Sequence, residues 1–338
     1  MKVLVIGGNR FVGRDLVWRF LAAGYDVTTF NRGRLADPFG KRIERLVGDR
    51  TTADFERLLG GREFDAAVDF AAFEEGDARR AIETLQGRMG HYVMISTGQV
   101  YLVREPRPQA AAREADYDGP LMAAPAEPLD RGEWEYGTGK RGAEDALAAA
   151  WAESRFPSTR LRLPMVNGER DYHRRIEGYL WRLLDGEPVL LPDGGRTPTR
   201  HVYSGAVARA VARTLGNPTT HGQAYNLAQD ETPTLAELLT TLAEILGAPA
   251  RFVEAPSDRL RAAGLELVRI SPFSGRWMSF LDPARAKAEL GFRHDPLRQY
   301  LERIVASFLA HPPAEPPESY AALRSREVDL AKGSGLEL

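Results

Sequence analysis

Residues 1–13, MKVLVIGGNRFVG, decide the fold of this chain. The run from Val3 to Ile6 is rich in β-branched residues and ends at two glycines, which predicts a short buried strand followed by a turn. From Phe11 to Ala23, apolar residues recur at helical spacing up to Gly24. The chain therefore opens as strand, glycine-rich turn and helix.

The glycine-rich turn has the composition of a phosphate-binding loop. Glycines after a first strand let the backbone approach a pyrophosphate, and the positive end of the following helix stabilises the phosphate charge. A glycine-rich turn alone is weak evidence, but its place between the first strand and the first helix makes it specific. The cofactor-binding residues predicted here are Gly7, Gly8, Arg10, Phe11, Val12 and Gly13.

Downstream, strand-length and helix-length segments alternate, which predicts an α/β fold with a Rossmann-type, doubly wound parallel sheet. We expect a dinucleotide-binding domain over residues 1–165 and a smaller α/β substrate lobe over 166–312, whose elements can interleave with the core. The Pro-rich, charged tail over 313–338 is expected to wrap the surface or fray. Further strands are expected at 26–30, 43–47, 66–70, 91–95 and 159–163, with a long helix from Trp134 to about Ser154. In the lobe, helices are expected at 174–184, 206–215 and 235–246 and strands at 189–191 and 224–227, and the Ala- and Pro-rich stretch 105–128 is expected to be a lid loop over a cleft.

Composition excludes several classes of protein. The 45 basic and 47 acidic residues nearly cancel, so no overall field attracts nucleic acid or an anionic membrane. With no cysteine, disulfides and thiolate metal sites are impossible. We expect a soluble, cytoplasmic protein, since the N-terminal apolar run is too short for a signal peptide and no run reaches the roughly 20 residues of a membrane span. No metal site is expected from the spacing of His91, His201, His221, His294 and His311.

The end of the second predicted strand bears on the choice of cofactor. An acidic residue about 20 positions after the glycine turn accepts the ribose hydroxyls of NAD, whereas an arginine there suits the extra phosphate of NADP. This chain has Asn31-Arg32-Gly33 at that place, and Arg10 within the turn. Because a guanidinium binds phosphate through two parallel hydrogen bonds, we expect NADP, with NAD as the alternative.

Tyr136 and Lys140 stand four residues apart in a predicted helix, and therefore on one face. A tyrosine is a poor base at neutral pH, but a neighbouring lysine cation lowers the pKa of a phenol by roughly 1 to 3. Such a phenol can exchange a proton with a substrate oxygen while hydride moves to or from nicotinamide. Thr97, after the fifth strand, supplies a hydroxyl at the carboxyl edge of the sheet, where ligands bind in open α/β folds.

Together these motifs resemble the extended short-chain dehydrogenase/reductase superfamily, in its NAD-dependent epimerase/dehydratase-like group. The resemblance covers nearly the whole chain and implies a catalytic set of Thr97, Tyr136 and Lys140, with Lys140 also holding the nicotinamide ribose. By the same resemblance, Asp49 and Arg50 flank the adenine, Ala71 and Ala72 let the cofactor lie close to the backbone, and Pro164 borders the nicotinamide. Members are commonly dimers through two core helices, so a homodimer is expected by analogy. Other matching segments are Asp69-Phe-Ala-Ala72, Glu144, Leu161-Arg-Leu-Pro164 and 282–292.

Departures from the family pattern narrow the reaction. Gly98 and Gln99 stand where sugar-nucleotide dehydratases carry an Asp and a Glu, which disfavours dehydration. Met165 replaces an Asn of many epimerases, and no His-x-x-Asp precedes the helix at Ala206, which disfavours classical sugar-nucleotide recognition. The Arg10 turn looks closer to an atypical subgroup that includes bacterial reductases and chloroplast stem-loop RNA-binding proteins.

Three functions therefore stay open. The favoured one is an NAD(P)-dependent oxidoreductase that acts on a carbonyl or secondary alcohol of a small molecule. An epimerase working on a retained NAD needs the same residues. A cofactor-sensing or RNA-binding protein does not need them. RNA binding is disfavoured by the balanced charge and by the lack of a basic stripe with interleaved aromatic residues. Candidate substrate contacts are Tyr172, His173, Arg196 and Arg200.

Overall fold

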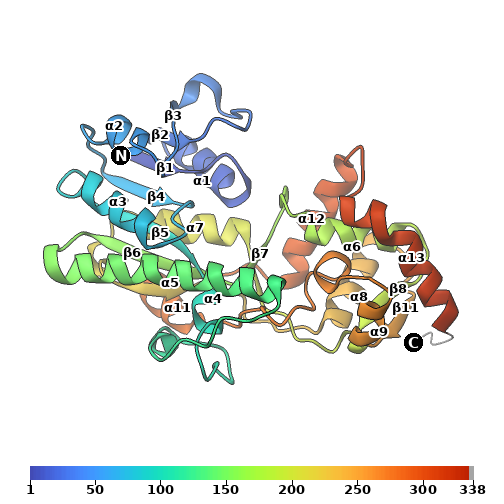
Figure 1. Cartoon of the computed structure of the whole chain (residues 1–338). Coiled ribbons are helices and arrows are strands. Elements are labelled where there is room, and N and C mark those ends of the chain that lie inside the picture. Colours follow the sequence, from blue (N-terminus) through green and yellow to red (C-terminus); the bar gives the residue numbers. More distant parts are fainter. Residues whose placement is uncertain (335–338) are drawn as a thin grey trace. The chain divides into compact units, whose positions relative to one another are not determined.

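The structure is a computed structural model that describes residues 1–334. The chain divides into two compact units (Figure 1). Unit 1 consists of residues 1–166, 204–228 and 279–294, and unit 2 consists of residues 167–203, 229–278 and the described part of 295–338. Within residues 1–334, no helix combines the length and the apolar character needed to cross a membrane.

A seven-stranded parallel sheet forms the centre of unit 1, in the order β10-β6-β5-β4-β1-β2-β3. This is the doubly wound order 3-2-1-4-5-6 with one more strand beside β6, which confirms the predicted fold class. The strands are β1 (Lys2–Ile6), β2 (Asp26–Asn31), β3 (Glu44–Val47), β4 (Ala66–Asp69), β5 (Tyr92–Thr97), β6 (Ser158–Leu163) and β10 (Ala224–Asn226).

The helices of unit 1 connect and cover these strands. The longest, α5, begins at Pro128, before the expected start at Trp134, because Glu127 accepts a hydrogen bond from the backbone N–H of Asp130 (2.9 Å) and caps the helix. The helices are α1 (Phe11–Ala22), η1 (Gly40–Arg42), α2 (Asp54–Leu59), α3 (Glu75–Leu85), α4 (Gln99–Leu102), η2 (Glu114–Tyr117), α5 (Pro128–Ser154), α7 (Ser204–Thr214), η4 (Pro218–Thr220) and α11 (Ala284–Leu290).

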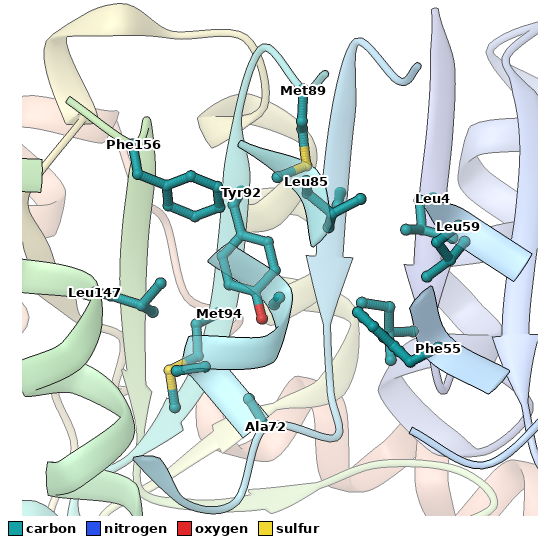
Figure 2. Packing of buried hydrophobic residues seen from close by; sticks show 14 of the residues in the cluster. Leu4, Phe55, Leu59, Ala72, Leu85, Met89, Tyr92, Met94, Leu147 and Phe156 are labelled. Carbon is teal, nitrogen blue, oxygen red and sulfur yellow. The ribbon is translucent and has the colours of Figure 1, made fainter. Parts of the chain in front are cut away.

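Side chains alternate across the sheet, so each strand contributes to two apolar layers. One layer packs the sheet against α2, α3 and α5, and Figure 2 shows Tyr92 and Met94 of β5 in it together with Leu147 of α5 and Phe55 of α2. On the other side of β1, Val5 faces α1, and α1 packs against α7. Burial on both faces explains why β1, β4 and β5 are nearly continuous apolar runs.

Unit 2 is a smaller α/β assembly around the parallel pair β8 and β11. Leu190, Val253 and Leu260 belong to its apolar core. Its helix α8 begins at a capping box in which Thr234 and Glu237 bind each other's backbone N–H groups. The elements are α6 (Arg175–Leu184), β8 (Val189–Pro192), η3 (Asp193–Gly195), β9 (His201–Tyr203), α8 (Leu235–Leu246), β11 (Phe252–Ala255), α9 (Ser257–Ala262), α10 (Leu267–Ile270), α12 (Leu297–Ala310) and α13 (Glu318–Ser334), while β7 (Met165–Asn167) crosses the boundary.

Two segments assigned by sequence to the substrate lobe belong to unit 1 instead. The 204–228 segment supplies α7 and β10, and β10 extends the main sheet by pairing Tyr225 with Leu161. The 279–294 segment supplies α11, which packs against α7 and β10. Strand pairing with β6 decides this placement, and a short strand's sequence does not reveal its partner.

Of the two outcomes expected for the C-terminal tail, wrapping the surface or fraying, fraying is wrong for residues 318–334, which form the packed helix α13. Arg182 of α6 and Glu327 of α13 form an ion pair at 2.6 Å in which both side chains are buried. Arg324 binds Asp185 at 2.6 Å, and Leu323 joins the core of unit 2. Charged residues in this tail therefore serve as internal partners. The expectation for 335–338 lies outside the described residues.

Hydrogen bonds hold the 105–128 segment against other parts of unit 1. Ala112 donates its N–H to the carbonyl of Phe280 (2.8 Å), and Tyr117 donates its hydroxyl to Asp145 of α5 (2.7 Å). Arg141 in turn donates to the carbonyl of Tyr117 (2.8 Å). The segment is a surface loop with one short helix, η2, and these three bonds hold its middle in place, while its role as a lid stays a prediction.

Candidate functional site

The turn between β1 and α1 accepts only glycine at three places. Gly7 and Gly8 have φ of +94° and +86°, which other residues rarely adopt. A Cβ atom on Gly13 would lie 2.6 Å from the Cα of Gly8, so α1 packs directly on the turn. The side-chain nitrogen of Asn9 is buried with no hydrogen-bond partner among the described residues. The glycine turn exposes its backbone at the N-terminus of α1, and the Asn9 side chain adds a hydrogen-bond donor. Together they suit the pyrophosphate of a dinucleotide.

Asn31 ties this turn to the end of β2. Its side-chain nitrogen donates to the Oδ1 atom of Asn9 (3.3 Å), while its own Oδ1 accepts from the N–H of Gly33 (3.0 Å) and from Arg45 (3.3 Å). Arg10, which follows Asn9, and Arg32, which follows Asn31, are both exposed.

Asp49, after β3, has a lowered pKa. The hydrogen bonds from Thr51 are the main cause, and Arg32 and Arg34 add smaller contributions through their charges. The edge where an adenosine ribose is expected thus holds several cations and one ionised carboxylate.

Two residues predicted to contact the cofactor are committed to the interior. Arg50 is only 7% exposed and forms ion pairs with Asp69 (2.8 Å) and Asp77 (3.0 Å), so its guanidinium does not flank an adenine. The Ala72 side chain belongs to the core layer of Figure 2, whereas Ala71 is partly buried. The buried side chain of Ala72 is compatible with the prediction that the cofactor lies close to the backbone there, and that contact stays a prediction. Pro164, between β6 and β7, is buried.

Lys140 lies buried beside Tyr136 on α5. It is 2% exposed and donates its Nζ to the carbonyl of Ile95 (2.9 Å) at the end of β5. The Nζ atom stands 4.9 Å from the ring centroid of Phe73 and 6.0 Å from that of Tyr136. Burial lowers the pKa of Lys140 to about 8, against opposing contributions from Asp69 and Glu144. The predicted phenol–lysine pair thus exists, and Tyr136 remains 38% exposed and accessible.

Two glycines between Tyr136 and Lys140 let α5 pack closely against its neighbours. A Cβ atom on Gly137 would lie 2.5 Å from Val103, and one on Gly139 would lie 2.7 Å from the carbonyl oxygen of Phe73. Each glycine in a helix interior costs about 1 kcal/mol relative to alanine. The helix tolerates both because they let it pack against α4 on one side and the segment after β4 on the other.

Thr97 ends β5, and the residue after it has no room for a side chain. The Thr97 Oγ1 atom accepts the N–H of Gln99 (3.2 Å). A Cβ atom on Gly98 would lie 2.2 Å from the hydroxyl oxygen of Ser279 and 2.5 Å from its Cβ atom. Ser279 therefore occupies the space that the dehydratase aspartate would need. No signal in the sequence connects Ser279 with this site, because it arrives from a distant segment of unit 1.

A buried ion pair supports the strands behind the site. Ser96 donates to Glu144 (2.6 Å), and Glu144 pairs with Arg162 of β6 (2.6 Å). Burial by itself raises the pKa of Glu144, but Arg162 and the bond from Ser96 outweigh it and the pKa is lowered. Arg162 also donates to the hydroxyl of Tyr101 (2.6 Å), which joins β5, β6, α4 and α5 in one polar network.

The predicted substrate residues lie in unit 2 and have separate partners there. The rings of Tyr172 and His173 contact each other, with centroids 4.1 Å apart and planes tilted by 40°. Arg196 forms an ion pair with Glu254 (2.8 Å), and Arg200 donates to the hydroxyl of Thr232 (2.9 Å). No group of three or more His, Asp or Glu side chains in residues 1–334 has the arrangement of a metal site.

The chain is similar in sequence to curated proteins with different activities. The chain is 27% identical over 289 residues to a 2'-dehydrokanamycin reductase of Streptomyces kanamyceticus, covering 83% of this chain and 77% of that protein. It is 25% identical over 263 residues to the chloroplast stem-loop binding protein of 41 kDa b of Arabidopsis thaliana, covering 73% of this chain and 64% of that protein.

The fold is also that of a UDP-glucose 4-epimerase from Thermotoga maritima, solved with UDP-glucose, with a TM-score of 0.73 and 20% identity over 92% of this chain and 99% of the epimerase. The family model of the NAD dependent epimerase/dehydratase family matches residues 3–228. That range contains the glycine turn, Thr97, Tyr136 and Lys140. The chain therefore belongs to the NAD-dependent epimerase/dehydratase family.

Proposed function

We propose that this protein is an NADP(H)-dependent oxidoreductase that interconverts a carbonyl and a secondary alcohol on a small molecule. The observation that carries the proposal is the placement of buried Lys140 with its Nζ 6.0 Å from the ring of accessible Tyr136, at the carboxyl end of β5. The displacement of any side chain at residue 98 by Ser279 supports simple reduction over dehydration.

In this proposal each residue of the site has one task. Tyr136 donates a proton to the substrate oxygen in the reducing direction and takes it back in the other. The charge of Lys140 stabilises the phenolate that remains, and the hydroxyl of Thr97 orients the same substrate oxygen. The glycine turn would hold the pyrophosphate of the cofactor, whose nicotinamide would supply or accept the hydride when bound.

The preference for NADP is part of the proposal. Arg10 and Arg32 are exposed near Asn31, where the ribose phosphate of NADP would lie. The ionised carboxylate of Asp49 favours NAD instead, so the relative affinity of the protein for NADPH and NADH tests this preference. Fluorescence titration with NADPH and NADH should show tighter binding of NADPH, and Arg32→Ala should reduce that preference about tenfold or more, as expected for loss of a charge-assisted phosphate contact. No fluorescence change with either nucleotide would overturn the proposed function.

The relatives support both this function and its main alternative. The reductase of Streptomyces kanamyceticus supports reduction, whereas the epimerase-like fold supports an epimerase that keeps its NAD. Tightly held NAD in the purified protein would favour the epimerase. Because positive and negative charges nearly cancel in the sequence, we propose a small-molecule substrate and neither a nucleic-acid nor a membrane partner. We also propose a cytoplasmic location and, by analogy with the family, a homodimer. Salt-sensitive RNA retention on a filter would contradict the absence of a nucleic-acid partner.

A further inference from the structure

Gln99 and Glu133 form a polar pair in unit 1 that the proposed reaction does not use. Gln99 opens α4, two residues after Thr97, and Glu133 lies on α5, one turn before Tyr136. The side-chain nitrogen of Gln99 donates a short hydrogen bond to the carboxylate of Glu133. Only the NH2 end of an amide can donate to a carboxylate, so this bond determines which way the Gln99 amide points.

The other end of the Gln99 amide is an unsatisfied acceptor. Gln99 is 7% exposed, and its Oε1 atom is buried with no hydrogen-bond partner among the described residues. Native proteins pair nearly all buried polar atoms, because an unmade buried hydrogen bond destabilises the fold. A donor on a bound ligand would satisfy this oxygen.

The charge around the pair selects the kind of donor. Glu133 lies at an exposed position of α5. Its pKa is raised, chiefly by partial burial of the carboxylate and also by the negative charge of Asp130, a second carboxylate one turn earlier. Two acceptors and a negative field suit an ammonium group, which carries three N–H donors and a positive charge. A hydroxyl offers one donor and no charge.

We propose that Gln99 and Glu133 bind an ammonium group of the substrate, close to the carbon whose oxygen exchanges its proton with Tyr136. This rests on the proposed function and narrows the substrate class to amino alcohols and amino ketones, such as amino sugars. The N–H of Gln99 donates to the Thr97 hydroxyl, and Glu133 precedes Tyr136 by one helical turn, so the pair adjoins the proposed catalytic residues at the start of α4 and on α5.

Two matched probes test the proposal, trans-2-aminocyclohexanol and trans-1,2-cyclohexanediol, which differ only in an ammonium in place of one hydroxyl. Calorimetric titration of the NADP⁺-loaded protein at pH 7 should show about tenfold or tighter binding of the amino alcohol, the difference expected when a charge-assisted pair replaces a neutral one. Equal affinity for the two probes in the wild-type protein would overturn the proposal.

Variants identify the residues responsible. Glu133→Gln keeps the size of the side chain and removes its charge, so the preference for the amino alcohol should fall to about twofold or less, and Gln99→Leu should weaken it as well. Glu135→Gln, an exposed carboxylate on another face of α5, should keep the wild-type preference. A preference that survives in Glu133→Gln, in a protein with an unchanged melting temperature, would refute the assignment.

Turnover separates this inference from the proposed function. NADP⁺ reduction is followed by absorbance with both probes. A binding preference for the amino alcohol without turnover of either probe supports the ammonium site and contradicts the oxidoreductase. Equal turnover and equal affinity for both probes support the oxidoreductase and contradict the ammonium site.

Discussion

Replacing Lys140 with methionine should stabilise the protein at neutral pH while impairing catalysis. Burial lowers the pKa of Lys140 from 10.5 to about 8, and at about 1.4 kcal/mol per pKa unit the charged ammonium costs the fold about 3 kcal/mol. Methionine removes that cost but also the hydrogen bond to Ile95, which contributes about 1 kcal/mol. The expected net gain at pH 7 is about 2 kcal/mol in the free energy of unfolding.

The pH dependence identifies the cause of that gain. Below pH 8 both folded and unfolded states hold the proton of Lys140, so the full cost of the buried charge is present. Between pH 8 and 10.5 the folded state loses the proton first, and the cost disappears as pH rises through this window. The advantage of Lys140→Met should therefore vanish near the upper end, where only the lost hydrogen bond remains.

Differential scanning calorimetry at pH 7 and at high pH measures this effect. A gain of about 2 kcal/mol corresponds to a rise of roughly 4 to 8 °C in the melting temperature of a domain of this size. Lys41→Met, at an exposed position, serves as the control and should change little. If Lys140→Met melts below the wild type at pH 7, or if its advantage does not depend on pH, burial of a charged lysine is not the source of the effect.

Three further variants test other parts of the structure. Tyr136→Phe should lower kcat by about 10²- to 10⁴-fold, the usual contribution of general acid–base catalysis, while fluorescence titration shows unchanged cofactor affinity. Gly13→Ala places a Cβ atom 2.6 Å from the Cα of Gly8. Thermal unfolding should therefore show about 1 to 3 kcal/mol of destabilisation, and cofactor binding should weaken. The control Gly132→Ala has open space around the new Cβ atom and should show neither effect. Burial lowers the pKa of His91 from 6.5 to about 3. As pH falls through that range, the unfolded state therefore takes up a proton before the folded state does. Chemical denaturation should show that acid destabilises the wild-type protein more steeply than the His91→Gln variant.

Much of unit 1 could be predicted because its signals are local. The glycines of the first turn report backbone conformations that only glycine adopts readily, and the four-residue spacing of Tyr136 and Lys140 places them on one helix face whatever surrounds the helix. The alternation of strands and helices predicts the parallel sheet in the same way, since each crossover is encoded in the residues that form it.

Long-range packing decided the rest. Arg50 reads like a cofactor contact in its local segment, yet Asp69 and Asp77 draw it inside. The charged tail reads as a fraying end, yet Glu327 meets Arg182 in the core of unit 2.

The sequence by itself determined the sheet class, the glycine turn and the phenol–lysine pair, because each depends on neighbouring residues or a fixed helical spacing. Only the tertiary structure decided that Ser279 fills the space beside Gly98, that β10 completes the sheet, and that the amide oxygen of Gln99 has no hydrogen-bond partner within residues 1–334. These contacts join segments far apart in the chain, and the short-range pattern of residues does not specify which distant segment will pack against which.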